Sequence, residues 1–215
     1  NGILKSNKIG EIFSPFFFNP SVSINDNFKF HCISSGISED VESKNSVWEL
    51  TRARLPWLLI GMLGGLFGAK VIGGFNLKTS FELALFIPLI AAMGGNVGIQ
   101  SAAIVVQGLA NNSLKLENVA QKLLKELVVA LVNGIICSVI LFIAAFTLGY
   151  STNLSTAVSI SLLTVTIFAA LFGTFIPLTL KKNNIDPALA TGPFITTIND
   201  VLGLFIYFWI GQAIL

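Results

Sequence analysis

The chain has 215 residues, of which 53% are hydrophobic and 11% are charged, and its formal net charge is +2. Ordinary globular domains contain about 25% charged residues, so this chain has too little charge to cover a water-exposed surface. A soluble enzyme is therefore excluded. The weak net charge, without a stripe of Lys and Arg that follows phosphates, also excludes nucleic acid as a partner. The composition predicts an all-α membrane protein in contact with the lipid bilayer.

Residues 1–45 are rich in Ser and Asn and lack sustained hydrophobic periodicity. Such a segment has too little apolar content for a core, so we expect a largely flexible cytoplasmic N-terminal segment. Ser46 and Glu49 have the spacing of a helix capping box. They predict that a connecting helix begins there and leads into a membrane domain over residues 46–215.

Five segments are apolar over the about 20 residues that a membrane-spanning helix requires. They cover about 55–75, 81–109, 127–148, 154–180 and 188–214. Between the second and third, residues 111–126 alternate leucines with charges, which predicts a short helix along the membrane interface.

The positive-inside rule gives the orientation. An N-terminus in the cytoplasm places seven basic residues inside: Arg52, Arg54, Lys115, Lys122, Lys125, Lys181 and Lys182. Only Lys78 then lies in an outside loop. We therefore expect a multi-pass protein of the cell (inner) membrane with its C-terminus outside.

Asp200 is the only charged residue of the last span and lies near its midpoint. A carboxylate at this depth costs about 2.5–3.5 kcal/mol on insertion scales, and such residues are usually functional. The structural alternative is an ion pair or a protonated, hydrogen-bonded carboxyl group. Lys70, near the end of the first span, is the only basic residue within any span, which argues against a pair.

The surroundings of Asp200 are rich in oxygen. Helical spacing predicts one face that carries Thr196, Thr197, Asp200 and Gly203. Pro193 lacks an amide donor and is expected to leave a carbonyl oxygen free one turn earlier. Hydroxyl, carbonyl and carboxylate oxygens suit Mg²⁺ or Ca²⁺ better than zinc or copper.

The second span contains Pro88 and the glycine-rich stretch 93–101. One interpretation is a break in the helix beside a watery cavity, which is a pointer to a transport path. The other is close helix packing through Gly94 and Gly98, and composition alone does not decide between them. Together with the Gly/Pro-interrupted span that carries Asp200, the broken helix beside a cavity is favoured. In the first span, packing is the favoured explanation for Gly61, Gly64, Gly65 and Gly68. Glu126 is interpreted as structural, with Lys122 as its partner at i−4.

A single carboxylate per chain is a poor match for a divalent cation. A two-fold homodimer with Asp200 facing the axis would bring two carboxylates together and double the Thr and Asn oxygens around them. Two-fold dimers are the commonest assemblies, so we expect a pore at a homodimer interface.

Five motifs now carry a family resemblance. They are RLPWLL at 54–59, GGN-x-G-x-QS at 94–101, KE at 125–126, DPA at 186–188 and GPF-x-TT-x-x-DV-x-G at 192–203. In this order, over residues 46–215, they resemble the membrane domain of the MgtE family of magnesium channels. The family has five-helix protomers that form a homodimer, with the second and fifth helices lining a central pore.

The resemblance implies a role for each matching residue. Asp200 matches the carboxylate that holds hydrated Mg²⁺, with Asn96 and Gly95 beside it on the second helix. Thr196 and Gly192 match positions that face the pore, and Asp186 matches an acid near the cytoplasmic mouth. Thr197, Asn199, Gly203 and Gly94 are further expected pore-lining residues. Residues 1–45 are too short for the acidic and CBS domains that precede the membrane domain in full-length members.

The resulting hypothesis is a non-enzymatic channel for passive Mg²⁺ uptake that also takes Mn²⁺ or Co²⁺. One alternative is a proton-coupled metal carrier with Asp200 as the protonated group. Another is a membrane assembly subunit that conducts nothing and uses its glycines for packing.

Overall fold

The computed structural model describes residues 47–75, 81–110, 119–184, 187 and 192–215. These residues form helices without any strand: α4 (Val47–Gly73), α5 (Phe81–Ala84), α6 (Ile87–Ala110), α7 (Val119–Thr147), α8 (Thr152–Lys182) and α9 (Pro193–Ile214). All except α5 are long and apolar enough to cross a membrane, which confirms the predicted all-α fold with five spans. The predictions for residues 1–45, Lys78 and Asp186 lie outside the described residues.

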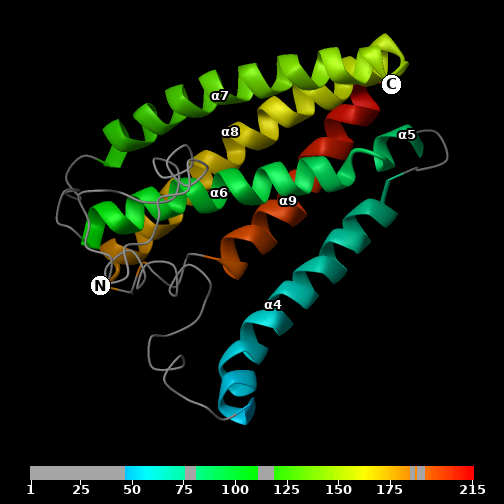
Figure 1. The fold of residues 1–215 in the computed structure, drawn as a ribbon. Helices are drawn as coiled ribbons and strands as arrows, with labels where there is room; N and C mark the ends of the chain where they lie inside the picture. Colours follow the sequence, from blue (N-terminus) through cyan, green and yellow to red (C-terminus); the bar gives the residue numbers. More distant parts are fainter. Residues whose placement is uncertain (1–46, 76–80, 111–118, 185–186, 188–191) are drawn as a thin grey trace, which may run out of the picture.

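The helices form a bundle with α8 at its centre (Figure 1). α8 packs against α6, α7 and α9, whereas α4 packs mainly against α9 at the edge of the bundle. α7 and α8 form a hairpin in which Gly149 takes a positive φ of 91°. Ser151 caps α8, since its hydroxyl accepts a hydrogen bond from the Leu154 amide at 3.2 Å.

The main apolar core lies at the end of the bundle where this hairpin turns. It joins side chains from α5 to α9, among them Leu83, Ile90, Leu162, Tyr207 and Phe208, all at most 2% exposed. Tyr207 also donates a 2.7 Å hydrogen bond to the carbonyl of Leu83, which gives the buried hydroxyl a partner. This bond ties α5 to α9.

The break predicted in the glycine-rich part of the second span is wrong. The chain turns at Leu85 and Phe86, and α6 is then helical without interruption through residues 93–101. Pro88 is the second residue of α6, where a missing amide hydrogen costs no helical hydrogen bond. Neighbouring helices approach Gly94 and Gly98 of this stretch closely.

The prediction of a separate interfacial helix is also wrong for residues 119–126, the part of it that the structure describes. Residues 119–126 are the first two turns of α7 and continue without interruption into the span, while 111–118 lie outside the described residues. Glu126 explains the continuity, because it is buried and accepts a 2.7 Å hydrogen bond from Ser101 of α6. No ion pair joins Glu126 to Lys122 within the part of the chain that is described.

Candidate ion-binding site

Asp200 lies in the third turn of α9 and is half-buried. Gly95 of α6 is opposite: a Cβ atom added there would lie 3.8 Å from Oδ1 of Asp200 and 3.7 Å from Cγ2 of Thr196. The structure therefore brings Gly95, Thr196 and Asp200 together where α6 meets α9. The absence of a side chain at residue 95 leaves the carboxylate and the Thr196 side chain room on this side.

Thr196 is tied to the start of its own helix. Its hydroxyl oxygen lies 3.1 Å from the carbonyl oxygen of Pro193 and 3.3 Å from that of Gly192, and it can donate its proton to either. A hydroxyl oxygen has two acceptor lone pairs besides its one proton, so Thr196 remains able to accept from a water molecule.

Gly192 precedes α9 with φ 73° and ψ −133°, a backbone conformation that favours glycine. Within the described residues, α9 begins at Pro193, and the carbonyl oxygen that was expected to be free one turn earlier lies outside the described residues. The Gly192 carbonyl accepts from the Thr196 amide at 3.2 Å, and a carbonyl oxygen has a second lone pair that can accept from a water molecule.

Asn96 and Gln100 are exposed on α6. They are four residues apart and thus share one face of the helix, next to the face that carries Gly95. Primary amides on the outer surface of a membrane-spanning helix lack hydrogen-bond partners if lipid covers them. This face is polar where a lipid-facing surface should be apolar.

The other predicted pore residues lie in helix contacts. Asn199 is 1% exposed, and its Nδ2 donates to the Gly94 carbonyl of α6 at 3.4 Å. Added Cβ atoms at Gly203 and Gly94 would lie 3.3 and 3.1 Å from the Val165 side chain of α8.

Thr197 points elsewhere again, since its side chain fills the space beside Gly64 of α4. The single face predicted for Thr196, Thr197, Asp200 and Gly203 is therefore not what the structure has. Thr196 and Asp200 face α6, Thr197 faces α4, and Gly203 faces α8.

The tightest contact lies next to the site. A Cβ atom on Gly173 of α8 would collide with the backbone of Gly98 in α6, and one on Gly98 would collide with the Asn199 side chain. These two glycines bring α6, α8 and α9 together at one level. The packing interpretation of Gly98 is thereby supported, while Gly95 leaves space beside the carboxylate.

Sequence reasoning missed the Ser101–Glu126 hydrogen bond and the Tyr207–Leu83 bond. Each joins residues at least 25 positions apart, so the local i−4 rule that suggested Lys122 could not identify these partners. No sequence pattern indicated that Glu126, in a stretch predicted to lie at the membrane interface, would be buried.

The described residues hold no cluster of metal-ligating side chains around Asp200. Within the described ranges, no group of three or more His, Cys, Asp or Glu residues lies close enough together to hold an ion. Asp200 is thus a single carboxylate, accompanied by neutral oxygen groups.

The fold and this site define a multi-pass helical membrane protein with one carboxylate near the middle of its last span. A family model described as MgtE, divalent cation transporter, matches residues 87–210. The chain belongs to the MgtE family.

Three relatives are similar over most of this chain. It is 34% identical over 177 residues to the magnesium transporter MgtE of Bacillus subtilis, which covers 81% of this chain and 39% of that protein. The magnesium transporter MgtE of Thermus thermophilus is 34% identical over 165 residues, which is 76% of this chain and 36% of that protein. The magnesium transporter MgtE of Enterococcus faecalis is 32% identical over 176 residues, which is 81% of this chain and 39% of that protein. The chain thus spans about two fifths of the length of these relatives.

Proposed function

We propose that the chain forms a channel for passive Mg²⁺ uptake, in which the Asp200 carboxylates of two protomers hold the hydrated ion. The observation that carries the proposal is the position of Asp200 against Gly95, beside the exposed amides of Asn96 and Gln100. Exposed amides and a half-buried carboxylate in adjoining spans are costly against lipid. Water or a second protomer on this surface removes that cost.

A homodimer supplies the second carboxylate that the described residues of one protomer lack. Mg²⁺ sheds its water reluctantly, so the pore binds it with water retained. In this proposal the outer-shell partners are the Thr196 hydroxyl, the Gly192 carbonyl and the Asn96 amide. Gly95 provides the space for them. Asp186 is assigned to the cytoplasmic mouth by the family resemblance alone, since it lies outside the described residues. Mn²⁺ or Co²⁺, with similar oxygen preferences, also pass.

The remaining four residues have an indirect role in this proposal. Gly94, Thr197, Asn199 and Gly203 lie in contacts between α9 and the helices around it. They hold α9 in the rotation that points Asp200 toward α6 and so shape the wall of the pore.

The driving force is the membrane potential, worth about 2.3 kcal/mol per charge per 100 mV. The proposed orientation has the N-terminus in the cytoplasm and the C-terminus outside the cell (inner) membrane. It is supported by Lys122, Lys125, Lys181 and Lys182, which lie at the ends of α7 and α8 that this orientation places inside.

Mg²⁺ uptake by proteoliposomes, read by an entrapped magnesium dye under an imposed potential, tests the carboxylate. Asp200→Asn has nearly the same volume without the charge, and we expect it to lower the uptake rate at least tenfold. The matched control is Glu82→Gln, which neutralises an exposed acid on α5 and should conduct as the unaltered chain does.

Unchanged flux through a folded Asp200→Asn protein would show that the carboxylate does not hold the ion. Flux that follows an imposed pH gradient and ignores the potential would favour the proton-coupled carrier. A complete lack of flux from the unaltered protein would favour the non-conducting subunit.

The dimer interface is tested separately with Asn96→Cys. Because two copies of this exposed residue approach each other across the proposed axis, a short bifunctional thiol reagent should join the protomers covalently. Ile140→Cys, which is exposed on α7, should give no such product in the same background, in which both native cysteines are replaced by Cys32→Ala and Cys137→Ala. Equal cross-linking at both positions would contradict a pore lined by α6 and α9.

A further inference from the structure

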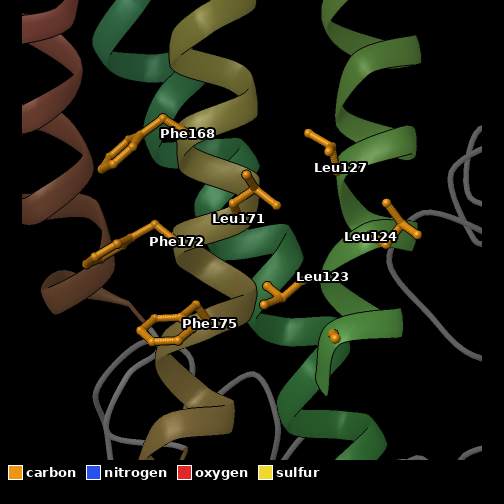
Figure 2. A pocket seen from close by; sticks show the side chains of 8 residues that line it. Leu123, Leu124, Leu127, Phe168, Leu171, Phe172 and Phe175 are labelled. Carbon is orange, nitrogen blue, oxygen red and sulfur yellow. The ribbon is translucent and has the colours of Figure 1, made fainter. Parts of the chain in front are cut away.

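A groove of about 590 Å³ is lined by residues of α7 and α8 and by none of α6 or α9, the helices that carry the candidate ion site. It lies between the start of α7 and the second half of α8, and Figure 2 shows side chains from both helices along it. Its lining is apolar: Ala120, Leu123, Leu124, Leu127, Phe168, Leu171, Phe172 and Phe175. The volume is within the about 300–1,000 Å³ of typical ligand sites.

The phenylalanines of the groove form a row along one face of α8 (Figure 2). The rings of Phe168 and Phe172 are stacked with centroids 5.6 Å apart, and Phe175 continues the row one turn later. Lys182 follows Phe175 by seven residues, or two helical turns. It therefore lies on the same face of α8, about 10 Å further along the helix axis, and it is exposed.

The end of the bundle at which the row stops is basic. Lys122 and Lys125 lie in the first turns of α7, and Lys181 and Lys182 in the last turn of α8. Glu126, the acid at this level among the described residues, is buried and hydrogen-bonded to Ser101 of α6. An apolar row that ends in lysines is complementary to a molecule with a long hydrocarbon part and an anionic head.

We propose that this groove binds an acyl chain of an anionic diacyl phospholipid from the surrounding leaflet, with its phosphate at Lys182 and Lys181. Basic positions between membrane helices are known to select anionic head groups, whereas bulk lipid contacts do not discriminate. A peptide in the groove would leave backbone groups without partners against an apolar lining. The proposal is independent of ion conduction.

The experiment measures which lipid remains on the protein. The full chain is placed in vesicles of equal phosphatidylglycerol and phosphatidylcholine with matched acyl chains, released into mild detergent, and examined by native mass spectrometry. We expect more phosphatidylglycerol than phosphatidylcholine to be retained. In Lys181→Gln/Lys182→Gln, the ratio should fall by about fivefold for each lysine that contacts the phosphate. Lys70→Gln, an exposed lysine in the last turn of α4, is the control and should keep the ratio.

A second variant tests the groove itself. Ala120→Phe places a ring in the apolar space and should reduce retained phosphatidylglycerol severalfold, whereas Ala144→Phe, at another exposed position of α7, should not. Both proteins are first compared by thermal unfolding in detergent. An unchanged lipid ratio in the lysine variant would overturn the proposal, as would equal retention in the two phenylalanine variants. A changed oligomeric state in Ala120→Phe would show that a second copy occupies the groove and would also overturn it.

Discussion

Replacing Gly173 with alanine tests whether the close approach of α6 and α8 determines the shape of the bundle. The added Cβ atom would lie 3.1 Å from both the Cα and the carbonyl carbon of Gly98, and still closer to its oxygen. Ordinary carbon contacts are about 3.5–4.0 Å. The atoms in the way are backbone of a continuous helix, so a side-chain rotation cannot relieve the collision and the two helices must move apart.

Overpacking of this kind costs about 1–3 kcal/mol. Alanine also stabilises a helix by up to about 1 kcal/mol relative to glycine, which offsets part of the loss. Gly65→Ala isolates the overpacking term, because Gly65 is also helical but has no heavy atom within 4 Å of an added Cβ. The difference between the two variants should therefore be about 1–3 kcal/mol.

Thermal unfolding in detergent, followed by size-exclusion chromatography of heated samples, gives the comparison. For a chain of this size 1 kcal/mol corresponds to about 2–4 °C in Tm, so Gly173→Ala should melt roughly 2–12 °C below Gly65→Ala. Equal Tm values would refute the reasoning, since they would show that α6 and α8 separate at no cost.

Two hydrogen bonds give further predictions. Tyr207→Phe removes one of the two donors to the buried Leu83 carbonyl, which still accepts from the Phe86 amide at 3.1 Å, and should lower the free energy of unfolding by about 0.5–1.5 kcal/mol. The control is Tyr150→Phe, since the Tyr150 side chain is half-buried and its hydroxyl makes no bond within the described residues. It should change the free energy of unfolding little, and equal losses would contradict the assignment. Ser101→Ala removes the donor to the buried Glu126 carboxylate and should cost about 1.5–3 kcal/mol by the same unfolding measurement. Ser101→Thr retains a hydroxyl and should recover part of that loss, whereas an unchanged Tm in Ser101→Ala would show that the bond contributes nothing.

The membrane spans were predictable because the hydrophobicity of each residue adds to that of its neighbours along the chain. α7 and α8 contain almost no charge over lengths that exceed a bilayer, and lipid allows only helices there. Their ends were less predictable. Residues 119–126 have the charge pattern of an interfacial helix, but they are part of α7. Glu126 is buried there because it accepts a hydrogen bond from Ser101 of α6.

The glycine-rich stretch of the second span shows a different limit. A G-x-x-x-G spacing is compatible both with a broken helix at a cavity and with close packing. The structure has both kinds of surroundings within one continuous helix, since Gly98 is packed against α8 and α9 while Gly95 leaves space beside Asp200. Residues three apart on one helix meet different neighbours, which composition does not reveal.

Charge and hydropathy by themselves determined that this chain crosses a membrane with five helices and carries one acid in the middle of the last. These properties depend on the transfer of each residue between water and lipid, which is local. Only the tertiary structure decided which helix each side of α9 faces, because helical periodicity groups residues without naming their partners. Thr197 contacts Gly64 of α4, Asn199 donates a hydrogen bond to the Gly94 carbonyl, and Asp200 lies against Gly95. That division of one helix among its neighbours places the carboxylate against Gly95 of α6, the residue that precedes the exposed Asn96.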